Sequence, residues 1–307
     1  MSRRFWVTAV LGVVACCLLV QPQATRIPPE SIKMHLRPEL QVAAGSFSLK
    51  ASGQPIRVLA FGDFGDGSDG QREVAAASLQ YHRQRPFDFA ITLGDNFYDK
   101  GMKSVDDPRW KIWWDQLYDP LGIQFYATLG NHDYGFRESP EAEILYSRKS
   151  PSWRMPATQY TFTAGWVQFF AIDSEVMTPY QLEWLQKELD ASTFRWKVVY
   201  GHHPIYSHGK HGDDQKLITE LLPVLKGRAD VYLAGHDHDM QHLKPEGNLH
   251  FFVCGTGGKI RPIRRGPRSL FAESSLGFAM LEADGSSMKV TFIDEVLHPL
   301  YEYTLKK

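Results

Sequence analysis

Short apolar runs recur along the chain, and each of them ends in a polar turn that contains glycine. The runs are rich in β-branched and aromatic residues, which is typical of strands that are buried on both faces. The sequence therefore predicts five buried strands. They are expected over residues 56–61, 89–93, 125–129, 196–200 and 231–234.

Segments with apolar residues at helical spacing lie between these strands. They predict helices over residues 70–83, 108–117, 179–189 and 215–225. An alternation of strands and helices indicates an α/β fold. Ligands of such sheets bind outside the carboxyl ends of the strands, and all five polar turns fall at that position.

The polar turns are rich in side chains that ligate metal ions. Carboxylates, imidazoles, an amide and a phenol together suit cations such as Fe, Mn or Zn rather than a thiolate site. A single histidine at a strand end is ordinarily structural, but five such turns at one edge of a sheet indicate a shared site. The candidate residues are Asp63, Asp95, Tyr98, Asn131, His132, His202, His203, His236, Asp237 and His238.

The spacing within two of these turns favours a site for two metal ions. Asp95 follows Gly94, which gives the backbone room to curl beneath an ion. The two oxygens of a carboxylate can bridge cations about 3.5–4 Å apart, as in enzymes that displace groups at phosphorus. His236 and His238 are two residues apart, so one imidazole for each metal is the favoured interpretation.

The five turns together resemble the five sequence blocks of the purple acid phosphatases. The resemblance covers residues 56–303, and its compact extent is similar to the single-domain, tartrate-resistant animal enzymes. It implies a metallophosphoesterase-type four-layer α/β/β/α sandwich with the metal site at the carboxyl ends of the strands. The blocks are Gly62-Asp63-Phe64-Gly65, Gly94-Asp95-Asn96-Phe97-Tyr98, Gly130-Asn131-His132-Asp133, Val199-Tyr200-Gly201-His202 and Gly235-His236-Asp237-His238.

The resemblance also implies which residues hold each metal. Fe(III) in the first site would be held by Asp63, Asp95, Tyr98 and His238. A divalent ion (Fe, Zn or Mn) in the second site would be held by Asp95, Asn131, His202 and His236, with Asp95 as the bridge. The wider metallophosphoesterase class has a histidine ligand where this chain has Gly65. Tyr98 makes good that loss, and its hard phenolate favours a trivalent ion.

The implied reaction is the hydrolysis of phosphate monoesters by a metal-bound hydroxide that attacks in line. The resemblance gives His132 the role of binding phosphate and His211 that of protonating the leaving group. His208 lies in the same loop and is the local alternative to His211. For His203, support of a ligand and simple packing stay equally open.

The chain departs from the animal enzymes in two respects. Residues 174–177 lead almost directly into the helix expected at Pro179, so the long exposed activation loop of those enzymes is expected to be missing. Their disulfide cannot form either, because Cys254 is the only cysteine outside the N-terminal segment. Cys254 is expected to be buried filler.

A basic cluster follows the turn at residues 255–258. A solvated loop is the favoured interpretation, and a rim that attracts anionic substrates is the alternative. The cluster consists of Lys259, Arg261, Arg264, Arg265 and Arg268.

The N-terminal residues read as a targeting segment, because two arginines precede an apolar run over residues 5–20. Residues 1–24 are expected to be a signal peptide or anchor, residues 25–53 a linker or lead-in, and residues 54–307 one catalytic domain. A lipoprotein signal around Cys16 is a further alternative. The protein is expected to be secreted, periplasmic or associated with the cell envelope, with membrane attachment only through this segment.

The formal net charge of −1 gives no basic field for nucleic acid. The resemblance to the purple acid phosphatases implies small phosphorylated substrates as the partners. Two other functions stay open for the same residues. One is a metallophosphodiesterase or nucleotide pyrophosphatase, and the other is a protein that binds metal or phosphate without turnover.

Overall fold

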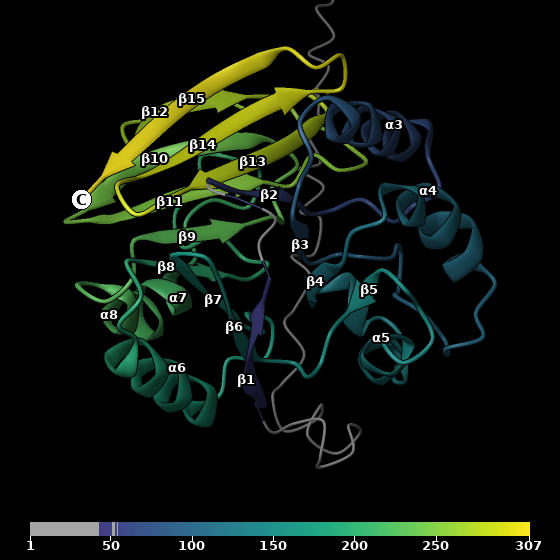
Figure 1. The fold of residues 1–307 in the computed structure, drawn as a ribbon, viewed down its shortest axis with the longest axis horizontal. Coiled ribbons are helices and arrows are strands. Elements are labelled where there is room, and N and C mark those ends of the chain that lie inside the picture. The colour runs from purple at the N-terminus through teal and green to yellow at the C-terminus, as the bar shows by residue number, and fades with distance from the viewer. Residues whose placement is uncertain (1–42, 51–52, 54) are drawn as a thin grey trace, which may run out of the picture.

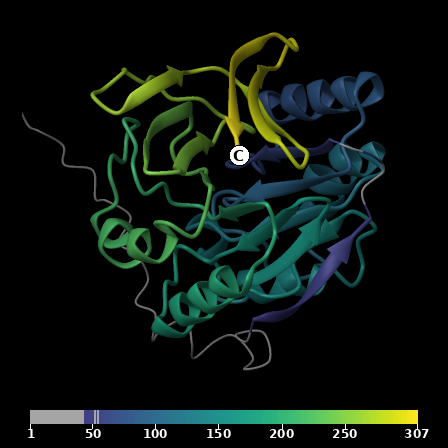
Figure 2. The ribbon, with the colours of Figure 1, turned by 60° about the vertical axis from the view of Figure 1, so that its left-hand side comes forward.

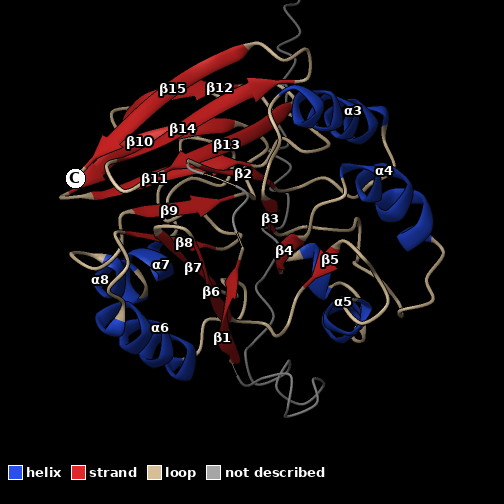
Figure 3. Ribbon diagram, viewed as in Figure 1, coloured by secondary structure: helices blue, strands red, loops and turns tan. Residues whose placement is uncertain are grey.

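The computed structural model describes residues 43–50, 53 and 55–307. Two β-sheets pack face to face in it, with helices on both outer sides (Figures 1 and 3). The eight-stranded sheet has the order β1 (Ala44–Leu49), β6 (Tyr160–Ala164), β7 (Val167–Ala171), β8 (Trp196–Tyr200), β9 (Val231–Ala234), β11 (Leu249–Cys254), β10 (Met240–Glu246) and β12 (Ser269–Glu273). The seven-stranded sheet has the order β15 (Pro299–Lys306), β14 (Ser287–Asp294), β13 (Gly277–Ala283), β2 (Ile56–Phe61), β3 (Phe89–Leu93), β4 (Phe125–Thr128) and β5 (Trp153–Arg154).

The central strands β8, β9 and β11 of the eight-stranded sheet are buried on both faces because alternate side chains enter two different cores. In β8, Val198 and Tyr200 join the core between the sheets, whereas Val199 joins the core beneath the helices. β9 and β11 alternate in the same way. The continuous apolar runs of the sequence are therefore strands in the interior of a layered fold.

The helices complete an α/β/β/α sandwich, as expected. Figure 2, a turned view, keeps α3 and the green helices α6 to α8 on opposite sides of the sheets. The seven-stranded sheet is flanked by α3 (Asp69–Gln84), a π-helical turn η1 (Trp110–Asp115), α4 (Gln116–Tyr118), η2 (Asp119–Leu121) and α5 (Ser139–Tyr146). The eight-stranded sheet is covered by α6 (Pro179–Ala191), α7 (Gln215–Glu220) and α8 (Leu222–Leu225).

Local signals explain where most helices begin. The side chains of Ser68 and Thr178 accept the first free backbone N–H groups of α3 and α6. The helix expected over 215–225 is divided in two, because Pro223 lies in the first turn of α8 and cannot continue the hydrogen bonding of α7. α5 was not predicted.

The expected linker over residues 25–53 needs a correction. Ala44–Leu49 forms β1, which pairs in parallel with β6 at the edge of the eight-stranded sheet. The targeting segment expected over residues 1–24, with Cys16, lies outside the described residues. In the part of the chain that the structure describes, no helix is long and apolar enough to cross a membrane.

Candidate metal centre

The turns after β2 and β3 bring together the ligands expected for the first metal. The Tyr98 hydroxyl donates to Asp63 Oδ1 and to Asp95 Oδ2, both at 3.0 Å. His238 comes from the turn after β9, and its Nε2 lies 3.3 Å from the Tyr98 oxygen and from Asp63 Oδ1. Four candidate ligand groups from three turns therefore face one point.

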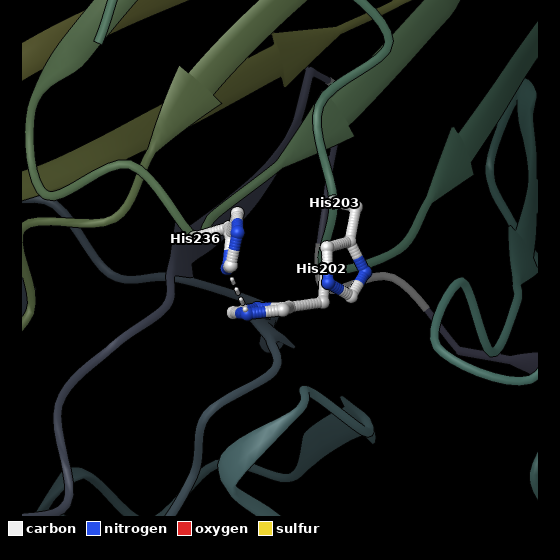
Figure 4. A group of neighbouring side chains, drawn as sticks. All are labelled: His202, His203 and His236. Carbon is white, nitrogen blue, oxygen red and sulfur yellow. Dashed lines mark hydrogen bonds between the residues drawn. The ribbon is translucent and has the colours of Figure 1, made fainter. Parts of the chain in front are cut away.

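The ligands expected for the second metal surround the His202 ring. His202 Nε2 lies 3.1 Å from His236 Nδ1, 3.2 Å from Asn131 Oδ1 and 3.4 Å from Asp95 Oδ1. Figure 4 shows the His202 and His236 rings turned toward each other. We call Asp63, Tyr98 and His238 the first group, and Asn131, His202 and His236 the second group. Asp95 presents Oδ2 to the first group and Oδ1 to the second, which is the geometry of a bridging carboxylate.

The backbone is strained where three of these ligands sit. Asp63, Asp95 and His236 have φ angles of 59°, 49° and 69°, in the left-handed region that residues with a Cβ rarely adopt. Such conformations persist only where the surroundings enforce them, and they cluster at functional sites. Gly130 is required nearby, because a Cβ there would lie 2.2 Å from the Asp95 backbone nitrogen.

A buried carboxylate ties the turns after β3 and β4 together. Asp133 accepts the backbone N–H groups of Asn96, Phe97 and Gly130. The Asn96 amide donates in turn to the Thr128 carbonyl, to Asp133 and to Glu143 on α5. Neither Asp133 nor Glu143 was among the predicted site residues. The only available signal was the place of Asp133 in the third block.

The charges at the site fit bound cations. Burial opposes protonation of His202, but Asp95 and then Asp63 outweigh it and raise the pKa of the imidazole to about 10. The carboxylates therefore attract positive charge, and a cation would take the place of that proton. Burial, followed by the neighbouring histidines, lowers the pKa of His236 well below its ordinary value, which favours the neutral imidazole that metals require. Two imidazole nitrogens that face each other share at most one proton, so a metal ion between them suits both.

His132 lies beside the first group, on the short helical turn η3 (His132–Tyr134). Its backbone N–H donates to Asp95 Oδ1 at 2.8 Å, and its ring centroid is 4.5 Å from that of Tyr98. Its Nδ1 lies 2.7 Å from the Asp99 carbonyl oxygen. This contact leaves Nε2 for a ligand, and 36% of the side chain is exposed.

The two candidate proton donors occupy different places. The ring of His211 stacks on His236 at 4.0 Å, and its Nδ1 lies 3.1 Å from Asp237 Oδ1. His208 turns away, because its Nε2 accepts the backbone N–H of Arg268 at 3.1 Å. A Cβ on Gly266 would meet the His208 ring at 2.4 Å, so this ring packs under the basic loop.

A cavity of about 220 Å³ opens beside the second group and the His211 ring. His203 is one of the residues that line it, with Nδ1 2.9 Å from Ser174 Oγ and Nε2 3.4 Å from Glu175 Oε2. His203 therefore lies next to the ligands rather than among the apolar core residues (Figure 4). The cavity is lined by His203, Pro204, His211, Gly212, Asp213, Asp214, Gln215 and His236.

The basic cluster is divided between the site and the surface. Lys259 Nζ lies 4.5 Å above the Tyr98 ring and 3.1 Å from Asp66, so it belongs to the rim of the site. Arg268 instead stacks on Tyr206 at 4.0 Å, away from the ligands. Cys254 is free and buried, as expected, and burial raises the pKa of its thiol to about 12.

Comparison with known proteins identifies the family. Residues 56–240 match the calcineurin-like phosphoesterases. Over 84% of this chain and 88% of its own length, purple acid phosphatase 7 of Arabidopsis thaliana is 30% identical. The chain belongs to the purple acid phosphatases. It is therefore a hydrolase with a dinuclear metal site.

Other relatives agree with this assignment. Tartrate-resistant acid phosphatase type 5 of Sus scrofa is 29% identical over 82% of this chain and 87% of its own. Among solved structures, GAP50, the anchor in the inner membrane complex of Plasmodium, has a TM-score of 0.76 at 24% identity and covers 83% of this chain and 89% of its own. A dimetal phosphatase from Danio rerio has a TM-score of 0.53 at 12% identity and covers 83% and 99%. These two likenesses concern the fold.

Proposed function

We propose that this phosphatase hydrolyses small phosphate monoesters with Fe(III) in the first site and a divalent Fe, Zn or Mn ion in the second. The observation that carries the proposal is the convergence of Tyr98 with Asp63, Asp95 and His238. A phenol oxygen within 3.0 Å of two carboxylates is a ligand set suited to a hard trivalent ion. Asp95 then links this ion to the His202 group.

The chain's own residues divide the work of the reaction. Bound metal ions would supply positive charge to the phosphoryl oxygens and lower the pKa of a coordinated water. His132 is partly exposed beside the first group and offers Nε2 to a phosphoryl oxygen. His211 borders the cavity, where it can give a proton to the departing ester oxygen. The cavity accepts the leaving group.

Metal analysis and a visible spectrum of the purified protein test the metal assignment. The oxidised protein should contain iron and absorb visible light, and Tyr98→Phe should lose the band, because Tyr98 is the only phenol among the proposed ligands. Tyr98→Phe should still contain iron at a reduced level. Iron-loaded wild-type protein without a visible band would refute the Fe(III)–tyrosinate assignment.

Paired assays on a phosphate monoester and a diester at acid pH test the substrate class. Faster turnover of the monoester supports the proposal. Preferred turnover of the diester or of a nucleotide anhydride would favour the phosphodiesterase or pyrophosphatase alternative. A metal-loaded protein that turns over neither substrate would favour a binding function.

We further propose that the protein is exported or attached to the cell envelope through residues 1–24. The support is the apolar run that follows two arginines. Fractionation of the native host tests this, and full-length protein in the cytosol would contradict it. Deletion of residues 1–24 should leave an active enzyme, since every proposed ligand lies beyond residue 56.

A further inference from the structure

The loop that carries His211 is held by a buried carboxylate that is not itself among the proposed ligands. Asp237 lies between His236 and His238 in the chain and is completely buried. Its Oδ1 accepts the backbone N–H of His211 at 3.0 Å and lies 3.1 Å from Nδ1 of the same residue. Two contacts from one residue to one oxygen fix both the backbone and the ring.

The second oxygen of Asp237 holds the other end of the loop through Ser207. The Ser207 hydroxyl donates to Asp237 Oδ2 at 2.5 Å. It accepts the Gly209 N–H at 2.9 Å and the Gln241 side-chain amide at 2.8 Å. A hydroxyl has one proton and two lone pairs, so the hydrogen-bonding capacity of Ser207 is filled.

Gln241 on β10 closes the arrangement. Its carbonyl oxygen accepts the His208 backbone N–H at 2.9 Å. The loop is pressed closely onto this cluster, because a Cβ on Gly209 would lie 2.4 Å from Asp237 Cγ. Contacts with this cluster thus fix four residues of the loop, which are Ser207, His208, Gly209 and His211. We call Ser207, Asp237 and Gln241 the loop clamp.

The loop clamp has a consequence for chemistry beyond holding a loop. The His211 ring is exposed for 34% of its side chain, yet its plane is set by the Asp237 contact on one edge and by stacking on His236 at an interplanar angle of 26°. Nδ1 faces Asp237, which leaves Nε2 as the nitrogen available to the cavity. An exposed imidazole without these contacts would sample several rotamers.

We propose that Asp237, supported by Ser207 and Gln241, is the positioning residue that aims Nε2 of His211 at the leaving group. This inference rests on the proposed function. As the P–O bond to the leaving group breaks, its electron pair stays on the ester oxygen, which takes the proton from His211 Nε2. The Nδ1 proton stays on the ring, directed at Asp237. The attacking water supplies the new oxygen on phosphorus and releases one proton to solvent.

Leaving-group dependence tests the role of Asp237. An alkyl phosphate needs a proton on its leaving oxygen, whereas nitrophenyl phosphate does not. We expect Asp237→Asn to lower kcat on the alkyl ester by roughly tenfold or more, as a share of the about 10²–10⁴-fold typical of general acids. kcat on nitrophenyl phosphate and both KM values should change little, with metal content unchanged.

A double variant separates positioning from simple structural support. If Asp237 acts through His211, then Asp237→Asn combined with His211→Ala should be no slower on the alkyl ester than His211→Ala alone. Additive losses, or equal losses on both esters, would overturn the proposal. If Asp237→Asn loses metal, Ser207→Ala is measured instead. A larger loss of kcat on the alkyl ester than on nitrophenyl phosphate would support the proposal, and equal losses on both would overturn it.

The controls distinguish failure of this inference from failure of the proposed function. Wild-type protein without monoesterase activity would refute the function itself. Active wild-type protein whose His211→Ala variant shows no leaving-group dependence would refute the inference alone. His208→Ala is a matched loop variant, and it should slow both esters equally and mildly, because the His208 ring faces Arg268 instead of the cavity.

Discussion

The two sheets contribute different ligand chemistry to one site. The turns of the seven-stranded sheet supply oxygen ligands, whereas those of the eight-stranded sheet supply imidazoles. The proposed oxygen ligands are Asp63, Asp95, Tyr98 and Asn131, and the proposed imidazole ligands are His202, His236 and His238. The buried acidic pair Asp133 and Glu143 lies beside the turns that carry the oxygen ligands, and the loop clamp contacts the turn of His236 and His238. The buried pair His242 and His250 lies elsewhere in the eight-stranded sheet, on β10 and β11.

Two buried groups, Glu143 beside the seven-stranded sheet and His242 in the eight-stranded sheet, should change the free energy of unfolding with pH in opposite directions. Burial, followed by the nearby Asp133, raises the pKa of Glu143 well above its ordinary value of 4.5. Burial, followed by the charge of His250, lowers the pKa of His242 to about 3. Glu143 therefore takes up a proton on folding, whereas His242 excludes one. A fall in pH below 6.5 therefore favours unfolding through His242, whereas a rise in pH above 4.5 favours unfolding through Glu143.

The largest effect is expected where the two halves meet, at Asp95. Asp95→Asn should release both metals and lower activity at least about 10³-fold, because the side chain loses the charge that balances two cations. Asn131→Ala touches only the His202 group and should cost mainly the second metal. Metal content per chain is the measurement. An Asp95→Asn protein with both metals at full occupancy would contradict the bridging role.

Asp133→Asn should be the most destabilising change beneath the oxygen ligands. Asp133 Oδ2 now accepts hydrogen bonds from several N–H groups, including the Gly130 N–H at 2.8 Å. In the variant, the NH₂ group of the new side chain would face these donors in place of an oxygen. We expect a loss of about 2–4 kcal/mol in the free energy of unfolding, from buried donors left without an acceptor. Glu143→Gln is the matched control, since an amide can still donate to Asp133, and it should cost less. Equal losses at neutral pH would show that Asp133 is not the centre of this network.

The pH dependence of the free energy of unfolding compares His242 and Glu143 directly. His242 has a folded pKa below its unfolded value of 6.5, so the unfolded chain binds more protons below pH 6.5 and stability falls as the pH falls. At pH 5 this loss is about 2 kcal/mol for one group. His242→Gln keeps hydrogen-bonding groups next to Tyr301 and His250, and should reduce the loss between pH 6.5 and 5.

Glu143→Gln should change the pH dependence with the opposite sign. The folded pKa of Glu143 is raised, so its contribution to stability is present below pH 4.5 and is lost as the pH rises. Relative to wild type, Glu143→Gln should therefore gain stability from pH 4.5 to 7. Denaturant unfolding at a series of pH values measures both variants. Parallel curves for all three proteins would contradict the difference between the halves.

Sequence patterns located the proposed ligands at the strand ends, but did not locate the residues that support them. Each ligand follows an apolar run, and that periodicity locates it at a strand end without knowledge of the fold. The role of Asp133 depends on Asn96 and Glu143, which are distant along the chain and meet it only in the folded protein. His211 and His208 sit in one glycine-flanked loop, and only the Asp237 and Arg268 contacts separate them. β1 and α5 were missed because neither shows clear periodicity, and β5 to β7 and β10 to β15 were missed because only the apolar runs that end in the polar turns were assigned as strands.

The smallest effect is expected from Lys259, at the rim of the oxygen half. Its ammonium lies 4.5 Å above the Tyr98 ring, where a cation is attracted to the π face. Asp66 holds it there at 3.1 Å. In an Fe(III)–tyrosinate pair, visible light moves an electron from the phenolate to the iron. A positive charge over the phenol ring stabilises the electron while it is on the phenolate, and would so raise the energy of the transition.

Lys259→Met should therefore move the visible band to longer wavelength, with iron content and the number of metals unchanged. Lys259→Arg keeps the charge over the ring and should leave the band close to its wild-type position. Asp66→Asn removes the negative charge beside Lys259 and should move the band to shorter wavelength. Because the two charges are paired, the visible band of the double variant Lys259→Met, Asp66→Asn should lie at a wavelength between those of the two single variants. If the band of Lys259→Met stays at the wild-type wavelength, the cation does not act on Tyr98. The interpretation of Lys259 as part of a solvated loop would then be favoured.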